Sequence, residues 1–85
     1  MNKDFNRAVG QNIKRLREEH NWDQKDLIAK LQLCNSTLTR SALAKIEVGQ
    51  RNLYLHELKL FKEIFKVNYE VFFEETPEND LSALI

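Results

Sequence analysis

The chain has 85 residues, of which 42% are hydrophobic, and its 13 basic and 13 acidic side chains give a formal net charge of zero. This length allows one domain with a single small core and excludes two independent cores. The single cysteine excludes an internal disulfide, and no apolar run approaches the roughly 18 residues that suggest a membrane span.

These properties predict a soluble protein with no membrane association. The first ten residues lack the apolar region of a signal peptide. A lone cysteine fits the reducing cytoplasm, which we take as the expected location. Two glycines, one proline and no alternating strand pattern indicate an all-α fold.

Charge is divided unevenly along the chain. Residues 1–51 carry ten basic and six acidic side chains, whereas residues 52–85 carry three basic and seven acidic ones. The two parts therefore have formal charges of +4 and −4. We interpret this as a molecule with one end suited to phosphate and one end unsuited to it. The alternative is two ordinary solvated surfaces.

The first predicted helix runs from about Asp4 to Glu19. It contains Gly10, and a glycine inside a helix costs about 1 kcal/mol relative to alanine. We therefore interpret Gly10 as a point where a neighbouring helix approaches closely. Arg17 borders the apolar face of this helix, which consists of Phe5, Ala8, Val9, Ile13 and Leu16.

The second predicted helix begins after Asp23 and runs from Gln24 to Leu31 or Gln32. Asp23 is a good N-cap, and the acid three residues later, Asp26, gives an approximate capping box. Apolar residues then recur at helical spacing at Leu27, Ile28 and Leu31.

The third predicted helix begins after Thr39 and ends near Gly49, a natural residue for the end of a helix. Thr37 is the alternative N-cap. Leu43 and Ile46 lie on the inner face. A short helix with an apolar back and a basic, polar front suits the major groove of DNA. The front consists of Arg40, Ser41, Ala44, Lys45 and Val48.

Three motifs follow one another here: Gln24-x-x-Leu27, the segment from Leu38 to Ile46, and Glu47-x-Gly49. Together they resemble the Cro/CI-type helix-turn-helix of the XRE family of prokaryotic and phage regulators. The resemblance covers residues 5 to about 73. It implies a five-helix fold like that of the lambda repressor DNA-binding domain.

The chain departs from the family pattern at three places. Ile28 stands where the family usually has alanine, and Gln32 stands where the turn usually has glycine. Residues 33–37 make the turn between the second and third helices about five residues longer than the common form. We therefore expect a variant with an extended turn.

The resemblance also implies which elements follow in the rest of the chain. A fourth helix is expected over about Leu55 to Phe65, and a short fifth helix over about Tyr69 to Glu74. The helix-turn-helix domain would comprise residues 1–75. An acidic linker and an apolar tail follow at residues 76–85.

The expected partner is double-stranded DNA, and the third helix would read an operator in its major groove. Arg40 is suited to a guanine, and the amide of Gln24 to a phosphate at a helix N-terminus. Arg51 lies in the loop that runs along the DNA backbone in the family. The candidate DNA-binding residues are Gln24, Thr39, Arg40, Ser41, Ala44, Lys45, Arg51 and Asn52.

Glu47 shares the inner face of the third helix, where an unpaired carboxylate would be costly. Arg17 is the candidate partner, and members of the family pair these two positions. The alternative is that Glu47 turns out to water.

Two aromatic residues close to one another, Phe72 and Phe73, exceed what one small core needs. We expect one of them to complete the core. The other would contribute with the apolar tail to a two-fold dimer. A disordered tail is the alternative. The candidate dimer contacts are Phe72, Phe73, Leu81, Leu84 and Ile85.

The leading hypothesis is therefore a sequence-specific DNA-binding transcription regulator, acting as a homodimeric repressor. The alternative is an antitoxin or another module that binds a protein partner through its acidic C-terminal part. An enzyme is not expected, because no catalytic arrangement, metal-ligand cluster or glycine-rich phosphate loop is present. No cofactor or metal is expected, and Cys34 is read as a packing or incidental residue rather than a redox switch.

Overall fold

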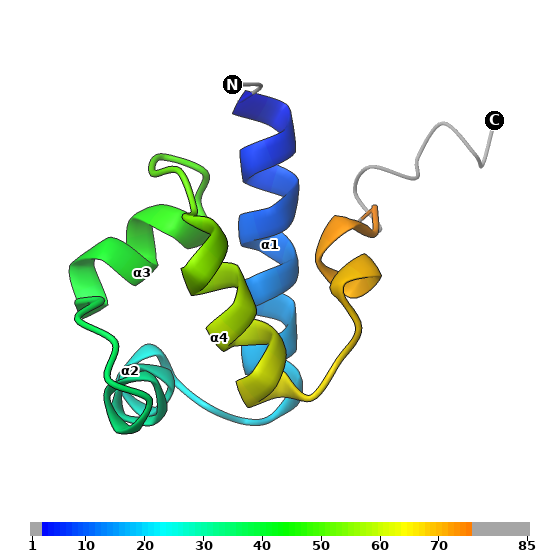
Figure 1. The fold of residues 1–85 in the computed structure, drawn as a ribbon. Coiled ribbons are helices and arrows are strands. Elements are labelled where there is room, and N and C mark those ends of the chain that lie inside the picture. Colours follow the sequence, from blue (N-terminus) through cyan, green and yellow to red (C-terminus); the bar gives the residue numbers. More distant parts are fainter. Residues whose placement is uncertain (1–2, 76–85) are drawn as a thin grey trace, which may run out of the picture.

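The computed structural model describes residues 3–75, and over this range the chain is helical with no strand (Figure 1). Helix α1 forms the spine of the fold and contacts α3, α4 and the last helical segment, η1. Figure 1 shows α2 and α3 on one side of α1 and η1 on the other. The elements are α1 (Lys3–Glu19), α2 (Gln24–Leu33), α3 (Arg40–Glu47), α4 (Leu55–Phe65) and the 3-10 helix η1 (Tyr69–Phe73).

The fold has four α-helices in the described range, so the prediction of a fifth α-helix is wrong. The expected segment is the 3-10 helix η1, in which the amide of Val71 bonds to the carbonyl of Asn68 at 3.1 Å. Five residues are too few to stabilise an α-helical nucleus on their own. The buried side chain of Asn12 also donates to the carbonyls of Phe72 and Glu74, at 2.8 and 2.6 Å, and fixes the end of the segment on α1.

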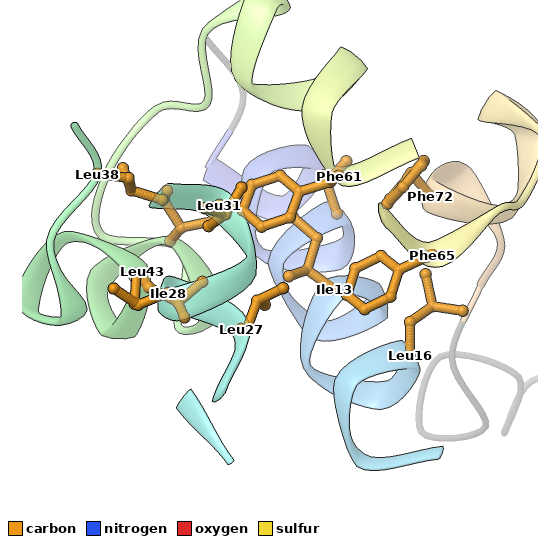
Figure 2. Packing of buried hydrophobic residues seen from close by; sticks show 12 residues of the cluster. Ile13, Leu16, Leu27, Ile28, Leu31, Leu38, Leu43, Phe61, Phe65 and Phe72 are labelled. Atoms are coloured by element: carbon orange, nitrogen blue, oxygen red, sulfur yellow. The ribbon is translucent and has the colours of Figure 1, made fainter. Parts of the chain in front are cut away.

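One apolar core joins all five elements (Figure 2). Phe61 on α4 is fully buried, and its ring centroid lies 6.2 Å from that of Phe65. Phe72 closes the core on the η1 side and is also fully buried. Of the two aromatic residues, Phe72 is therefore the one that completes the core, and its ring is not exposed to a partner. Phe73 is 45% exposed, and its role as a dimer contact stays a prediction. The buried apolar residues are Val9, Ile13, Leu16, Leu27, Ile28, Leu31, Leu38, Leu43, Ile46, Phe61, Phe65 and Phe72.

Gly10 is the point at which α1 and α3 touch. A Cβ atom built on Gly10 would overlap the backbone carbonyl oxygen of Ile46. The prediction of a close helix approach at Gly10 is thus confirmed. This contact holds α3 against α1 by its backbone, which sets the position of the whole helix.

The capping box predicted at the start of α2 is confirmed. The Asp23 carboxylate accepts from the amide of Asp26 at 2.9 Å, and the Asp26 carboxylate accepts from the amide of Asp23 at 3.0 Å. The helix continues to Leu33, beyond its predicted end at Leu31 or Gln32. It stops because Asn35 adopts a left-handed backbone with φ of 64°, and the Ser36 amide bonds back to the carbonyl of Leu31 at 3.1 Å.

Within residues 3–75, no helix combines the length and apolar character needed to cross a membrane. The same residues contain no cluster of three or more His, Cys, Asp or Glu side chains that could hold a metal ion.

Candidate nucleic-acid interface

Helix α3 begins immediately after Thr39. The Oγ1 atom of Thr39 accepts a hydrogen bond from the amide of Ala42 at 3.1 Å, and the backbone at Thr39 is extended. The prediction of Thr39 as N-cap is confirmed, and the alternative start after Thr37 is excluded. Arg40 is therefore the first residue of the helix, followed by Ser41.

The two faces of α3 differ sharply in exposure. Leu43 and Ile46 are almost completely buried against the core. On the opposite face, four residues of the helix and its C-cap residue reach or approach solvent. These are Arg40, Ser41, Lys45 and Val48, which are exposed, and Ala44, which is half-buried. The helix thus turns a basic and polar surface outwards.

A Schellman motif ends α3. Gly49 has φ of 79°, the amide of Gln50 bonds to the carbonyl of Lys45 at 2.8 Å, and the amide of Gly49 bonds to the carbonyl of Ile46 at 3.1 Å. A Cβ atom on Gly49 would lie 2.8 Å from the Cα of Arg7. Glycine is required here both for its backbone conformation and for the close passage of the chain over α1.

Glu47 lies beneath the exposed face of α3 and is only 3% exposed. Its two oxygens accept from Nε and Nη2 of Arg17, at 2.8 and 3.1 Å. The third nitrogen of the guanidinium, Nη1, donates to the carbonyl of Trp22 at 2.9 Å. Hydrogen bonding to Glu47 and the charge of that carboxylate raise the pKa of Arg17 above its ordinary value, although burial opposes this. Glu47 does not turn out to water.

Gln24 joins this ion pair from the start of α2. Its Nε2 atom donates to Oε1 of Glu47 at 3.0 Å. The first side chain of α2 is therefore fixed relative to α3 through the same carboxylate. An amide has a second N–H hydrogen, so this bond leaves Gln24 able to donate to another acceptor as well.

Arg51 has partners that the sequence did not suggest. Its Nη1 and Nη2 atoms donate to the two oxygens of Glu57, at 2.9 and 3.1 Å, and Nη1 also donates to the carbonyl of Asn52 at 3.0 Å. The guanidinium lies over the Tyr54 ring, 5.2 Å from its centroid. A contact between Arg51 and DNA phosphate, expected from the family, would compete with these bonds.

The ion pair changes the titration of both partners. Hydrogen bonding to Glu57 raises the pKa of Arg51. Burial alone would raise the pKa of Glu57, but the bonds from Arg51 and from the Tyr54 amide outweigh it and hold that pKa below its ordinary value. The same hydrogen bonds hold the loop after α3 on the start of α4.

Asn52, the other candidate in this loop, is exposed and is tied to α1. Its Oδ1 atom accepts from Nδ2 of Asn6 at 2.6 Å. The loop is thus held from two directions, by α4 through Glu57 and by α1 through Asn6. These contacts fix the backbone of the loop next to the end of α3.

Sequence reasoning missed three polar residues that build this arrangement: Glu57, Asn12 and Asn6. Glu57 had a detectable signal, because an acid at the third position of a helix can bond to the amide before the helix, as it does to Tyr54 at 3.0 Å. Asn12 had only a weak signal, a polar residue next to the apolar stripe of α1. Asn6 had none.

Basic side chains lie close to Asp23, the acidic N-cap of α2. The bond from the Asp26 amide lowers the pKa of Asp23, and the charges of Lys25 and Arg40 lower it further. Arg40 is thus within electrostatic reach of the N-terminus of α2. Helix N-termini carry partial positive charge, which adds to these side chains.

The chain matches the family model described as helix-turn-helix over residues 13–72, which is most of its length. It belongs to the Cro/CI-type helix-turn-helix family. No curated protein and no solved structure matches the chain. In this DNA-binding helix-turn-helix domain, α2 and α3 are the two helices of the motif. The face of α3 that points away from the core is exposed.

Proposed function

We propose that the protein is a sequence-specific transcription repressor of the cytoplasm, with the helix-turn-helix domain acting as a homodimer. Helix α3 enters the major groove of an operator. Repression follows when the bound protein covers a site that overlaps a promoter.

The observation that carries this proposal is the exposed row on α3. Arg40 stands at the N-terminal end, where side chains of a recognition helix reach base edges, and it suits the O6 and N7 atoms of guanine. Ser41 and Lys45 add hydrogen-bond donors one and five positions later. Ala44 is small and suits the methyl group of thymine.

The contacts that hold α3 on the core favour sequence-specific over non-specific DNA binding. The Gly10 contact positions the backbone of α3 against α1, and the Arg17–Glu47 pair fixes its last turn. Base contacts discriminate only when the helix is held in one place, because a small displacement breaks a bidentate hydrogen bond. The arrangement therefore supports direct readout by α3.

Three of the other candidates, Gln24, Thr39 and Asn52, serve as phosphate contacts in this proposal. Gln24 begins α2, where a phosphate can accept bonds from the helix N-terminus. Thr39 and Asn52 flank the two ends of α3 and are both exposed. Such contacts fix orientation on the duplex and carry no sequence information themselves.

Selection of bound sites from a random double-stranded DNA pool tests the proposal. We expect a pseudo-palindromic consensus whose half-sites lie about one helical turn apart, roughly 10 base pairs. An enriched pool without any consensus would contradict sequence-specific recognition. A consensus with a single half-site would support recognition and contradict the homodimer.

A further inference from the structure

Two basic side chains of α1, Arg7 and Lys14, are separate from the candidate DNA-binding residues on α2, α3 and the following loop. Both side chains are exposed. They project in nearly the same direction, because seven residues make close to two full helical turns. Their Cα atoms are about 10 Å apart along the helix axis, which is far enough to neutralise two different phosphate groups. We call this pair the α1 stripe.

The α1 stripe lies on the same side of the fold as the exposed face of α3. The Ile46 carbonyl contacts Gly10, so α3 meets α1 by its C-terminal end, and Figure 1 shows α3 extending from the side of α1. The buried residues of α3 join the core together with Ile13 of α1. Ile13 projects about 60° from Gly10 in one direction, and the α1 stripe projects about 40–60° in the other direction. The stripe and the exposed face of α3 therefore both point away from the core.

The loop after α3 passes directly over Arg7. A Cβ atom on Gly49 would lie 2.8 Å from the Cα atom of Arg7 and 2.9 Å from its Cβ atom. The Arg7 side chain therefore starts beside the C-terminal end of α3, close to the exposed side chain of Lys45. With α3 in the major groove, a DNA strand that borders the groove passes within reach of this guanidinium.

The charges of the α1 stripe are not used inside the fold. Within residues 3–75, neither Arg7 nor Lys14 forms an ion pair. Three other arginines are paired with acids: Arg15 with Glu19 and Glu74, Arg17 with Glu47, and Arg51 with Glu57. In the described part of the chain, α1 therefore supplies an unpaired arginine beside the end of α3, whereas the arginine of the loop is paired.

We propose that Arg7 and Lys14 bind the phosphate backbone of DNA and so extend the DNA-binding surface onto α1. Arg7 precedes residue 13, where the match to the helix-turn-helix family begins, so this contact does not follow from the family match. Contacts between cations and phosphates strengthen binding to any sequence and carry no base preference. The inference rests on the proposed function, in which α3 occupies the major groove.

Salt titration of DNA binding by the full chain tests the α1 stripe. The test variants are Arg7→Gln and Lys14→Gln, and Arg7→Lys is the variant that keeps the charge. All three keep the Cβ atom, so the packing of Arg7 against Gly49 is preserved. Substitutions at exposed positions change stability little, and circular dichroism verifies the fold of each variant.

The matched control is Lys62→Gln, which removes one positive charge at a distance from α3. The Lys62 ammonium lies 5.3 Å from the ring centroid of Tyr69 in η1. Figure 1 shows η1 on the side of α1 opposite to α3. A loss of affinity caused by net charge alone would therefore be seen with this control as well.

We expect Arg7→Gln and Lys14→Gln each to reduce the slope of log affinity against log salt by about one unit for each bound copy of the chain. At about 0.1 M salt, each should lower affinity about tenfold per bound copy, equally on the selected operator and on a scrambled duplex. Arg7→Lys and Lys62→Gln should bind as wild type does. Unchanged slopes with Arg7→Gln and Lys14→Gln would overturn the inference, as would an equal loss with Lys62→Gln.

The two duplexes also separate this inference from the proposed function. Reduced slopes, together with equal affinity of wild type for operator and scrambled DNA, would support the α1 stripe and refute sequence-specific recognition. A preference for the operator with unchanged slopes would refute the α1 stripe and leave the proposed function intact.

Discussion

Arg17 and Glu47 are separated by thirty positions in the sequence and form a buried ion pair with two hydrogen bonds, of 2.8 and 3.1 Å. The pair joins the last turn of α1 to the last turn of α3, and Gln24 adds a third bond from the start of α2. One carboxylate therefore fixes the three helices relative to one another. The exposed face of α3 depends on this carboxylate for its orientation.

Glu47→Ala should destabilise the fold strongly. The substitution leaves the Arg17 guanidinium buried beside no carboxylate, at a cost of about 3–5 kcal/mol. Domains are stable by only about 5–15 kcal/mol in total, so the variant should be close to unfolded. Urea unfolding followed by circular dichroism measures the loss, with Glu63→Ala, at an exposed position of α4, as the control. Equal midpoints for Glu47→Ala and wild type would show that the pair adds no stability.

Gly10→Ala should lower stability, which is the opposite of the usual effect. In an unobstructed helix, alanine is about 1 kcal/mol more favourable than glycine. Here the new Cβ meets a backbone carbonyl of Ile46 that no side-chain rotation can move. Overpacking of this kind costs about 1–3 kcal/mol. Thermal unfolding of Gly10→Ala beside Lys14→Ala, an exposed site on α1, decides the sign, and a stabilised Gly10→Ala would refute the close contact.

Arg51→Ala should lower the stability of the fold and should not remove a contact with DNA phosphate. It removes both bonds to Glu57, a buried carboxylate, at a cost of about 1–3 kcal/mol. A side chain that neutralises a DNA phosphate contributes about one unit to the slope of log affinity against log salt. Because the charge of the guanidinium is already paired with the carboxylate of Glu57, we expect Arg51→Ala to leave this slope unchanged on non-specific DNA. A slope reduced by one unit would instead assign Arg51 to phosphate.

The same pair predicts a dependence of stability on pH. The pKa of Glu57 is lower in the folded chain than its ordinary value of about 4.3 in an unfolded chain. The stabilisation is therefore complete above about pH 4.3 and is lost as the pH falls through the folded pKa. Wild type should lose more stability than Arg51→Ala between pH 6 and pH 3. Urea unfolding at each pH measures the free energy of unfolding of both proteins. If both lose the same amount as the pH falls, Glu57 is not the source of the pH dependence.

Much of the fold could be predicted from local sequence signals. Asp23 and Asp26 specify the start of α2 by a capping box, Thr39 specifies the start of α3, and Gly49 specifies its end. Each signal acts through the chemistry of a few adjacent residues. Gly10 could be interpreted for a different reason, because glycine in the interior of a helix is unfavourable and needs a packing explanation.

The remaining features depend on contacts between residues distant in sequence. The form of η1 is set by Asn12, sixty positions before Phe72, and no local pattern reveals this bond. The bonds between Arg51 and Glu57 could not be predicted for a similar reason, since the loop must first fold back onto α4. The candidate dimer contacts Leu81, Leu84 and Ile85 lie outside the described residues, so they stay a prediction.

In the proposed complex with DNA, α3 reads base sequence through Arg40. Titration of wild type and Arg40→Ala on the selected operator and on scrambled DNA, at several salt concentrations, tests it most directly. We predict that the variant loses about 1–3 kcal/mol on the operator, relaxes the preference at one base pair in each half-site, and binds scrambled DNA nearly as wild type does. An equal loss of affinity on both DNAs would make Arg40 a phosphate contact and contradict the proposed reading of the groove.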